Sequence, residues 1–291
     1  MNRSKQPPKP RAVAKPDARR VALDVLQDVS CADAYASLSL NKRLQESRLD
    51  ARDREFVTTL VYGTLEHRMR LDYVVDAHLR EPKTMPLLRD LLRMSAYQLL
   101  FLDRVPEHAV VDEAVKIAKA MAPHASGLIN AVLRNLVRGK ADIRWPEDPV
   151  EYLSVYHSVP RWLVERLIEA YGRETAEQIV AYRQPEHALT VRPNRMRVDP
   201  KAWERRMDEK GWHWKPGRVP DAYQATGVGE IGKDEDFRNG LFSIQGESSM
   251  LAVQAVAPRN GWKILDACAA PGGKSAYLAE LMQGSGRVFA W

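Results

Sequence analysis

The chain has 291 residues, of which 45% are hydrophobic and 28% charged, proportions that are typical of a soluble globular protein of about two domains. A mainly disordered, collagen-like or membrane-embedded chain is excluded, since no run approaches the roughly 18 consecutive apolar residues of a spanning helix. Two cysteines, Cys31 and Cys268, are too few for a disulfide framework or a zinc cluster, and free thiols fit a reducing cytoplasm.

The formal net charge of +6 is confined to the N-terminus. Residues 1–20 hold seven Lys or Arg residues and one Asp, whereas the rest of the chain carries 37 cationic and 37 anionic side chains. Residues 1–16 therefore form a basic, proline-rich tail without the apolar stretch of a secretory signal. Such a tail could attract RNA phosphates or serve only as a solvated leader, and the sequence leaves both interpretations open.

Residues 17–140 read as an all-helical domain. Apolar side chains recur at helical spacing over residues 87–100, 114–121 and 127–137, which places one apolar stripe on each predicted helix. Prolines mark the predicted helix ends, at Pro86, Pro106 and Pro123. A segment of this length can bury a core of its own.

Residues 145–240 are predicted to form a small α+β module. Asp199 is expected to cap a helix over residues 200–210, and Trp203, Trp212 and Trp214 are expected to fill the core of the module rather than to stack on bases. The other predicted elements are a helix over residues 160–171 and strands over residues 189–191 and 212–214.

The segment 241–291 carries a strand, a glycine-rich turn, a helix and a second strand. These elements are predicted over residues 262–267, 269–274, 275–282 and 288–291. This order within about 30 residues is a βαβ unit, whose two strands run parallel. One βαβ unit is only a part of a doubly wound sheet, so we expect the sequence to be truncated.

The turn between this strand and helix predicts a site for an anion. A helix that begins there exposes unpaired N–H groups and the positive end of its dipole, and a carboxylate or phosphate binds at such a terminus. Gly272 and Gly273 let the backbone turn sharply and let a ligand approach, and Ala269 and Ala270 keep the approach open. The spacing matches neither common phosphate-binding glycine motif, and an ordinary strand-to-helix turn remains the alternative.

Three segments together resemble the RsmB/NOP2/Sun family of RNA cytosine-C5 methyltransferases. Residues 266–274 (DACAAPGGK) resemble the cofactor loop of that family, and residues 244–252 (IQGESSMLA) resemble the segment before its catalytic core, with Gly246 where Asp is usual. Residues 108–136 resemble a NusB-type RNA-binding domain. The resemblance implies a multidomain fold: an all-α NusB-like domain (17–140), a small α+β module (145–240) and the first βαβ unit of a Rossmann-like methyltransferase domain (241–291).

The resemblance also implies the cofactor, the substrate and the residues of the cofactor site. S-adenosylmethionine would bind with its methionine portion over the glycine turn, and Asp266 would orient the loop through hydrogen bonds. The substrate would be a cytosine of small-subunit ribosomal RNA, methylated at C5 by a cytoplasmic monomer that needs neither a metal nor a membrane. The cofactor-binding residues carried over from the family are Cys268, Ala269, Ala270, Pro271, Gly272, Gly273 and Lys274.

No catalytic residue is assigned. Methylation at C5 requires a cysteine thiolate that adds to C6 of the cytosine, and neither Cys31 nor Cys268 lies in the sequence context that the family uses for this nucleophile. Cys31 is expected to be a buried small side chain, and Cys268 matches a position of the cofactor loop. The 291-residue chain by itself is therefore predicted to be inactive.

Two other functions remain open at this stage. The chain could be a NusB-like RNA-binding or antitermination module without catalysis, or a methyltransferase that acts on a protein. The seven histidines show no paired spacing typical of a metal site. Arg192, Arg195 and Arg197 could line a path for RNA or form a solvated strand edge.

Overall fold

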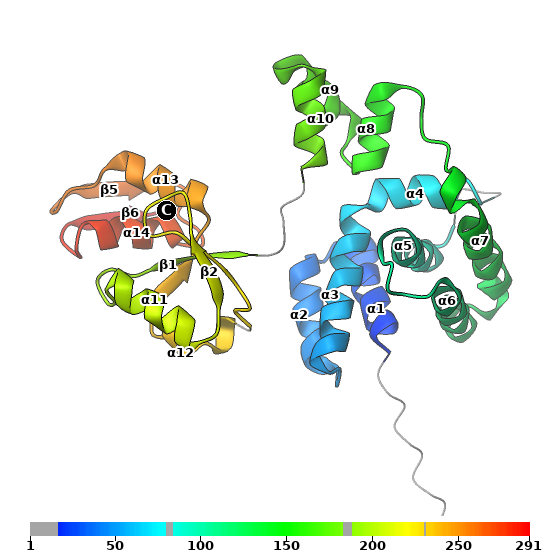
Figure 1. The fold of residues 1–291 in the computed structure, drawn as a ribbon, viewed down its shortest axis with the longest axis horizontal. Helices are drawn as coiled ribbons and strands as arrows, with labels where there is room; N and C mark the ends of the chain where they lie inside the picture. Colours follow the sequence, from blue (N-terminus) through cyan, green and yellow to red (C-terminus); the bar gives the residue numbers. More distant parts are fainter. Residues whose placement is uncertain (1–16, 80–83, 183–187, 230) are drawn as a thin grey trace, which may run out of the picture. The chain divides into compact units, whose positions relative to one another are not determined.

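The computed structural model describes residues 17–79, 84–182, 188–229 and 231–291. The chain divides into two compact units, residues 1–182 and residues 183–291, which we call the helical unit and the sheet unit (Figure 1). The predicted basic tail of residues 1–16 lies outside the described residues. Within the described ranges, no helix is both long and apolar enough to cross a membrane.

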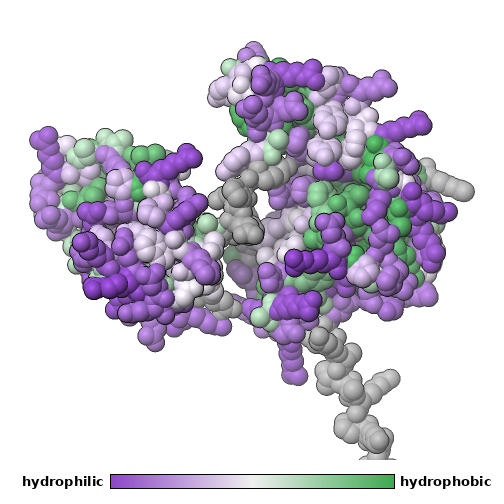
Figure 2. Space-filling model, viewed as in Figure 1, coloured by the Kyte–Doolittle hydropathy of each residue, from purple (hydrophilic) through white to green (hydrophobic). Residues whose placement is uncertain are grey.

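The helical unit begins with seven α-helices, which confirms the helical prediction for residues 17–138. Their apolar stripes form one continuous core that includes Leu133, which has no exposed surface. In Figure 2, apolar side chains gather on this unit where α5, α6 and α7 lie. The α-helices are α1 (Ala18–Ala32), α2 (Ala36–Glu46), α3 (Ala51–Glu66), α4 (Arg68–Asp76), α5 (Pro86–Phe101), α6 (Glu107–Met121) and α7 (Ser126–Gly139), and the short 3-10 helices are η1 (Pro123–Ala125) and η2 (Lys140–Asp142).

Three further helices complete the helical unit: α8 (Pro149–His157), α9 (Arg161–Tyr171) and α10 (Arg173–Ala181). They pack on one another, and α8 also packs on α4. The guanidinium carbon of Arg70 on α4 lies 3.9 Å from the ring centroid of Tyr156 and 5.1 Å from that of Trp145. This aromatic cage joins α8 to the preceding helices, and residues 145–182 group with those helices in one compact unit.

The sheet unit contains a four-stranded antiparallel sheet with the strand order β2-β3-β1-β4. Trp203 on α11 is fully buried beside Trp212 and Phe242, which confirms a core role for these two tryptophans. Asp199 caps α11 as predicted, since its side chain accepts from the N–H groups of the first turn. The elements are β1 (Leu189–Pro193), α11 (Pro200–Glu209), β2 (His213–Pro216), β3 (Tyr223–Thr226), η3 (Ile231–Lys233), α12 (Glu235–Arg238) and β4 (Phe242–Ile244).

The last segment forms the predicted βαβ unit. Its two strands pair in parallel, with Ile264 opposite Val288 and Leu265 opposite Phe289. The first pair packs toward the helices, whereas Leu265 is 67% and Phe289 50% exposed on the other face. The elements are α13 (Glu247–Val256), β5 (Lys263–Asp266), α14 (Gly273–Leu281) and β6 (Arg287–Ala290).

The four-stranded sheet and the βαβ unit are not separate bodies. One core cluster joins residues of the turn before β3, including Val219 and Ala222, to Met250 on α13 and Leu278 on α14. β4 lies at residues 242–244 and pairs with β1, so the predicted boundary at residue 240 separates two strands of one sheet. The turn that precedes α14 is thus carried by a unit with a shared core.

Candidate functional site

The turn between β5 and α14 is held at both ends by one carboxylate. Asp266, the last residue of β5, accepts a hydrogen bond from the backbone N–H of Cys268 at 3.2 Å. Its second oxygen accepts from the hydroxyl group of Ser275, in the first turn of α14, at 2.7 Å. Asp266 therefore orients the turn through hydrogen bonds, as the sequence predicts for this residue.

The backbone of the turn requires glycine at its last position before α14. Gly272 has φ of 105°, a conformation that side chains with a Cβ rarely adopt, and no atom lies within 4 Å of the place a Cβ would take. Cys268, Ala270 and Pro271 are exposed, whereas Ala269 is buried.

The N-terminus of α14 is open to a ligand. No side chain caps this terminus, so its first N–H groups and its dipole present a positive end beside the exposed residues of the turn. Lys274 lies in the first turn and is partly exposed. The arrangement suits a small molecule that carries a carboxylate or another anion. The seven predicted cofactor-binding residues lie together here, because they are consecutive in one tight turn.

A buried polar cluster that was not expected from the sequence joins α14 to the four-stranded sheet. Arg192 on β1 is 1% exposed, and its guanidinium donates to both oxygens of Glu280 on α14. The same group lies 4.1 Å from the ring centroid of Tyr277 on α14, and its Nε donates to the side-chain oxygen of Gln245 at 2.8 Å. The cluster ties the four-stranded sheet to the helix of the βαβ unit.

Of the three arginines at residues 192–197, Arg192 lines neither an exposed path for RNA nor a solvated strand edge. Arg192 is buried and committed to Glu280, because its β1 position points into the interior of the sheet unit. Arg195 pairs with Asp221, and Arg197 donates to the backbone oxygen of Asn239. The prediction for Cys31 is also wrong: this thiol is exposed at the end of α1, so it is no core residue.

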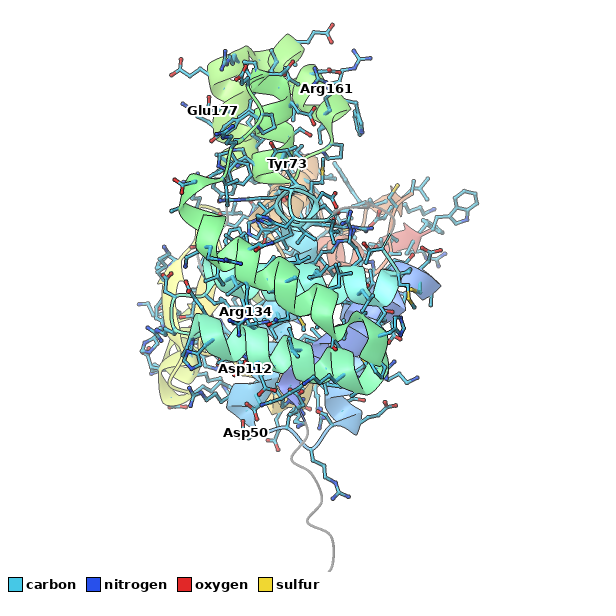
Figure 3. The ribbon with its side chains drawn as sticks, turned by 90° about the vertical axis from the view of Figure 1, so that its right-hand side faces the viewer. Asp50, Tyr73, Asp112, Arg134, Arg161 and Glu177 are labelled. Carbon is cyan, nitrogen blue, oxygen red and sulfur yellow. The ribbon has the colours of Figure 1, made fainter. Side chains whose placement is uncertain are left out.

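A separate hollow lies in the helical unit. It is a groove of about 430 Å³ between α6 and α7, whose helices lie side by side in Figure 3, with Asp112 and Arg134 on its walls. The groove carries side chains of both charge signs, so its charge selects no single kind of ligand. Among the described residues, no cluster of three or more His, Cys, Asp or Glu side chains could hold a metal ion.

Three family models match successive parts of the chain. The NusB family model matches residues 16–138, and the ferredoxin-like domain of the RsmF/B-like methyltransferases matches residues 159–225. The model of the 16S rRNA methyltransferases RsmB/F matches residues 253–291. This last match contains the turn between β5 and α14.

Curated relatives align with nearly the whole chain. The probable ribosomal RNA small subunit methyltransferase B of Bacillus subtilis (strain 168) is 37% identical over 277 residues, which are 94% of this chain and 62% of that protein. The protein of the same description from Synechocystis sp. (strain PCC 6803) is 30% identical and covers 94% of this chain and 63% of itself. The chain thus spans less than two thirds of the length of these relatives.

A solved structure has the same fold. The crystal structure of PH0851 superimposes with a TM-score of 0.73 over 94% of this chain and 63% of that chain, at 21% sequence identity. Sequence matches and the order of the domains agree with one another, from the NusB-like helices through the ferredoxin-like sheet to the turn before α14. Over successive segments, the chain is similar to the NusB family and to the RsmB/F (NOP2/Sun-type) methyltransferases.

Proposed function

We propose that this chain serves the methylation of C5 of a cytosine in small-subunit ribosomal RNA, with S-adenosylmethionine bound at Cys268–Lys274. One observation carries the proposal: the open N-terminus of α14 follows a turn that is fixed by Asp266, within the segment that matches the 16S rRNA methyltransferase model. When bound, S-adenosylmethionine supplies an activated methyl group.

The residues of the turn fit the methionine end of this cofactor. Its carboxylate would accept hydrogen bonds from the first N–H groups of α14, where the helix dipole favours a negative charge. Gly272 and Gly273 let the ligand approach the backbone closely, and Ala270 presents only a methyl group toward solvent. Asp266 is already engaged with the backbone of Cys268 and the hydroxyl group of Ser275, so its role is to hold the turn.

Ribosomal RNA is the proposed partner of a monomeric, cytoplasmic protein. The match of residues 16–138 to the NusB family, and relatives that are described as ribosomal RNA methyltransferases, support this proposal. A NusB-like protein that binds RNA without catalysis is the second candidate, favoured by the same helical match. RNA binding without any binding of S-adenosylmethionine would select this second candidate.

Methyl transfer by the 291-residue chain itself is not expected. A thiolate must add to C6 before C5 can take a methyl group, and neither Cys31 nor Cys268 is proposed as that nucleophile. Incubation with radiolabelled S-adenosylmethionine and unmodified small-subunit RNA should leave the RNA unlabelled. Label at C5 of cytosine that disappears in Cys268→Ser would contradict the assignment of Cys268 to the cofactor site.

Equilibrium dialysis with radiolabelled S-adenosylmethionine tests the site. Gly272→Ala places a Cβ on a backbone with φ of 105°, a strain of roughly 1–2 kcal/mol, and we expect the affinity to fall about tenfold as the turn leaves this conformation. Gly127→Ala is the matched control, because Gly127 lies in α7 and no atom lies within 4 Å of the place that a Cβ would take. Equal affinity of both variants would place the ligand elsewhere.

A further inference from the structure

The side chain of Gln245 has one free hydrogen-bonding group. Gln245 follows β4 and is 6% exposed, and its side-chain oxygen accepts from Nε of Arg192 at 2.8 Å. Because a guanidinium only donates hydrogen bonds, this contact fixes the orientation of the amide. The Nε2 group therefore faces the other way, where it is buried and has no hydrogen-bond partner.

The free amide lies against the beginning of α14. A Cβ on Gly273 would lie 3.8 Å from Nε2 of Gln245. The position is held from two sides, since Arg192 contacts Glu280 and Tyr277 on the same helix. The cluster thus fixes the amide relative to the helix terminus that carries the proposed cofactor site.

An unpartnered buried N–H donor is rare in native proteins and costly unless a ligand uses it. The NH₂ group of Gln245 lies beside the N-terminus of α14, which already presents unpaired backbone N–H groups. The missing partner is therefore a hydrogen-bond acceptor, and an anion suits this place best. Ala270 and Pro271 of the turn are exposed, which leaves the turn room to adjust around a ligand. Hydrogen bonds of this kind are often completed only when the ligand is bound.

We propose that Gln245 binds the carboxylate of the ligand held at α14 and that Arg192 is the residue that positions it. The inference rests on the proposed function, and it adds a specificity determinant for the amino-acid end of the cofactor. Gln245 lies outside the turn itself, on the segment that links the four-stranded sheet to the βαβ unit. A ligand that lacks the amino-acid end has no carboxylate for Gln245 to bind, so this side chain does not raise its affinity.

Two related ligands separate this role from a structural one. S-adenosylhomocysteine carries the carboxylate, whereas 5′-methylthioadenosine lacks the whole amino-acid end. In Gln245→Glu, one carboxylate oxygen can still accept the hydrogen bond from Arg192. The other oxygen takes the place of the NH₂ group, so that a negative charge stands where the wild type has a hydrogen-bond donor. NMR titration of the full chain should show affinity for S-adenosylhomocysteine at least tenfold weaker than in the wild type, and affinity for methylthioadenosine within twofold.

A control variant and a measurement on the wild type complete the test. Gln254→Glu makes the same change in charge on α13, where the amide already donates to the hydroxyl group of Tyr277, and both affinities should stay within twofold. In the wild type, S-adenosylhomocysteine should shift the side-chain NH₂ resonance of Gln245, and methylthioadenosine should not. This measurement on the wild type remains informative even if a variant fails to fold.

The outcomes distinguish failure of this inference from failure of the proposed function. If Gln245→Glu lowers the affinity for both ligands equally, or lowers neither affinity, the proposed role of Gln245 is wrong but the cofactor site stands. An NH₂ resonance of Gln245 that does not move when the amides of Gly272 and Gly273 shift has the same meaning. A wild-type chain that binds neither ligand overturns both proposals.

Discussion

The helical unit and the sheet unit bury their side chains in different ways. The first seven helices share one apolar core, in which Leu133 and Leu60 have no exposed surface. The sheet unit has two smaller apolar clusters, and the buried ion pair of Arg192 with Glu280 bridges its sheet and its last helix. The helical unit also contains a buried ion pair, because Arg93 pairs with Asp90 on α5. The difference is that one apolar core joins the first seven helices, whereas the sheet unit has separate apolar clusters and a buried ion pair between its sheet and its last helix.

Arg192→Met should have the largest effect on the sheet unit. It leaves the carboxylate of Glu280, which is 11% exposed, without its cation, and removal of one partner of a buried pair costs about 3–5 kcal/mol. Hydrogen exchange read by mass spectrometry should show faster exchange in β1 and α14 and unchanged exchange in α1–α7. Arg166→Met is the control, because the side chains of Arg166 and Glu169 on α9 are 73% and 71% exposed and such a pair contributes about 1 kcal/mol or less. Equal loss of protection around the two substituted sites would contradict the larger contribution of the buried pair.

Leu133→Ala tests the apolar core of the helical unit. The side chain is fully buried on α7, so its truncation should lower the free energy of unfolding by about 2–5 kcal/mol. Leu128→Ala changes the same residue type on the same helix at a position that is 40% exposed, and we expect a clearly smaller loss. Thermal unfolding followed by circular dichroism at a helical wavelength compares the two variants, and equal losses would contradict the proposed core.

Alkaline pH should weaken the sheet unit through Tyr223. Burial, together with the hydrogen bond that the hydroxyl group donates to Glu204 at 3.1 Å, raises the pKa of Tyr223 to about 12. Because the folded state holds this proton more tightly than the unfolded state does, stability falls as pH rises from about 10 to about 12, by roughly 1 kcal/mol per pH unit. Urea unfolding at a series of pH values should show this slope in the wild type, and Tyr223→Phe should lack its contribution. An identical pH dependence in both proteins would contradict the raised pKa.

Gly246→Asp should give a small gain in stability. Gly246 is the N-cap of α13, with φ of −64° and no side-chain cap, and a Cβ there meets open space. An Asp side chain can accept from the first N–H groups of the helix, which stabilises a helix by a few tenths of a kcal/mol relative to Gly. The melting temperature should therefore rise slightly in Gly246→Asp and fall in Gly246→Ala, which adds no acceptor. A fall in both variants would show that the terminus does not accept a cap.

The elements with strong local patterns could be predicted from the sequence. Apolar stripes predicted the helices of residues 17–138, and the order of strand, glycine turn, helix and strand predicted the parallel pairing of β5 with β6. β3 and β4 have only four and three residues, too few for an alternating pattern to stand out. The seven residues of the turn could be named because their sequence resembles the cofactor loop of a known family.

Features that depend on distant contacts could not be predicted. Arg192 lies 53 residues from Gln245 and 88 from Glu280 in the sequence, so nothing near it indicates that it is buried. The contact of Arg70 with Tyr156 likewise joins α8 to the helical unit across a long stretch of chain. For Cys31, the residue type favoured burial, but its place in the last turn of α1 leaves the thiol exposed.

We expect S-adenosylmethionine to bind at the turn before α14, in the sheet unit. Ultraviolet crosslinking of the full chain to radiolabelled S-adenosylmethionine, followed by protease digestion and peptide mapping, locates the bound cofactor. We expect the label on the peptide that contains Cys268–Lys274 and its loss when unlabelled S-adenosylhomocysteine is added in excess. Label that is displaced by S-adenosylhomocysteine but lies only on peptides of the helical unit would place the cofactor elsewhere, and so would the absence of any displaceable label.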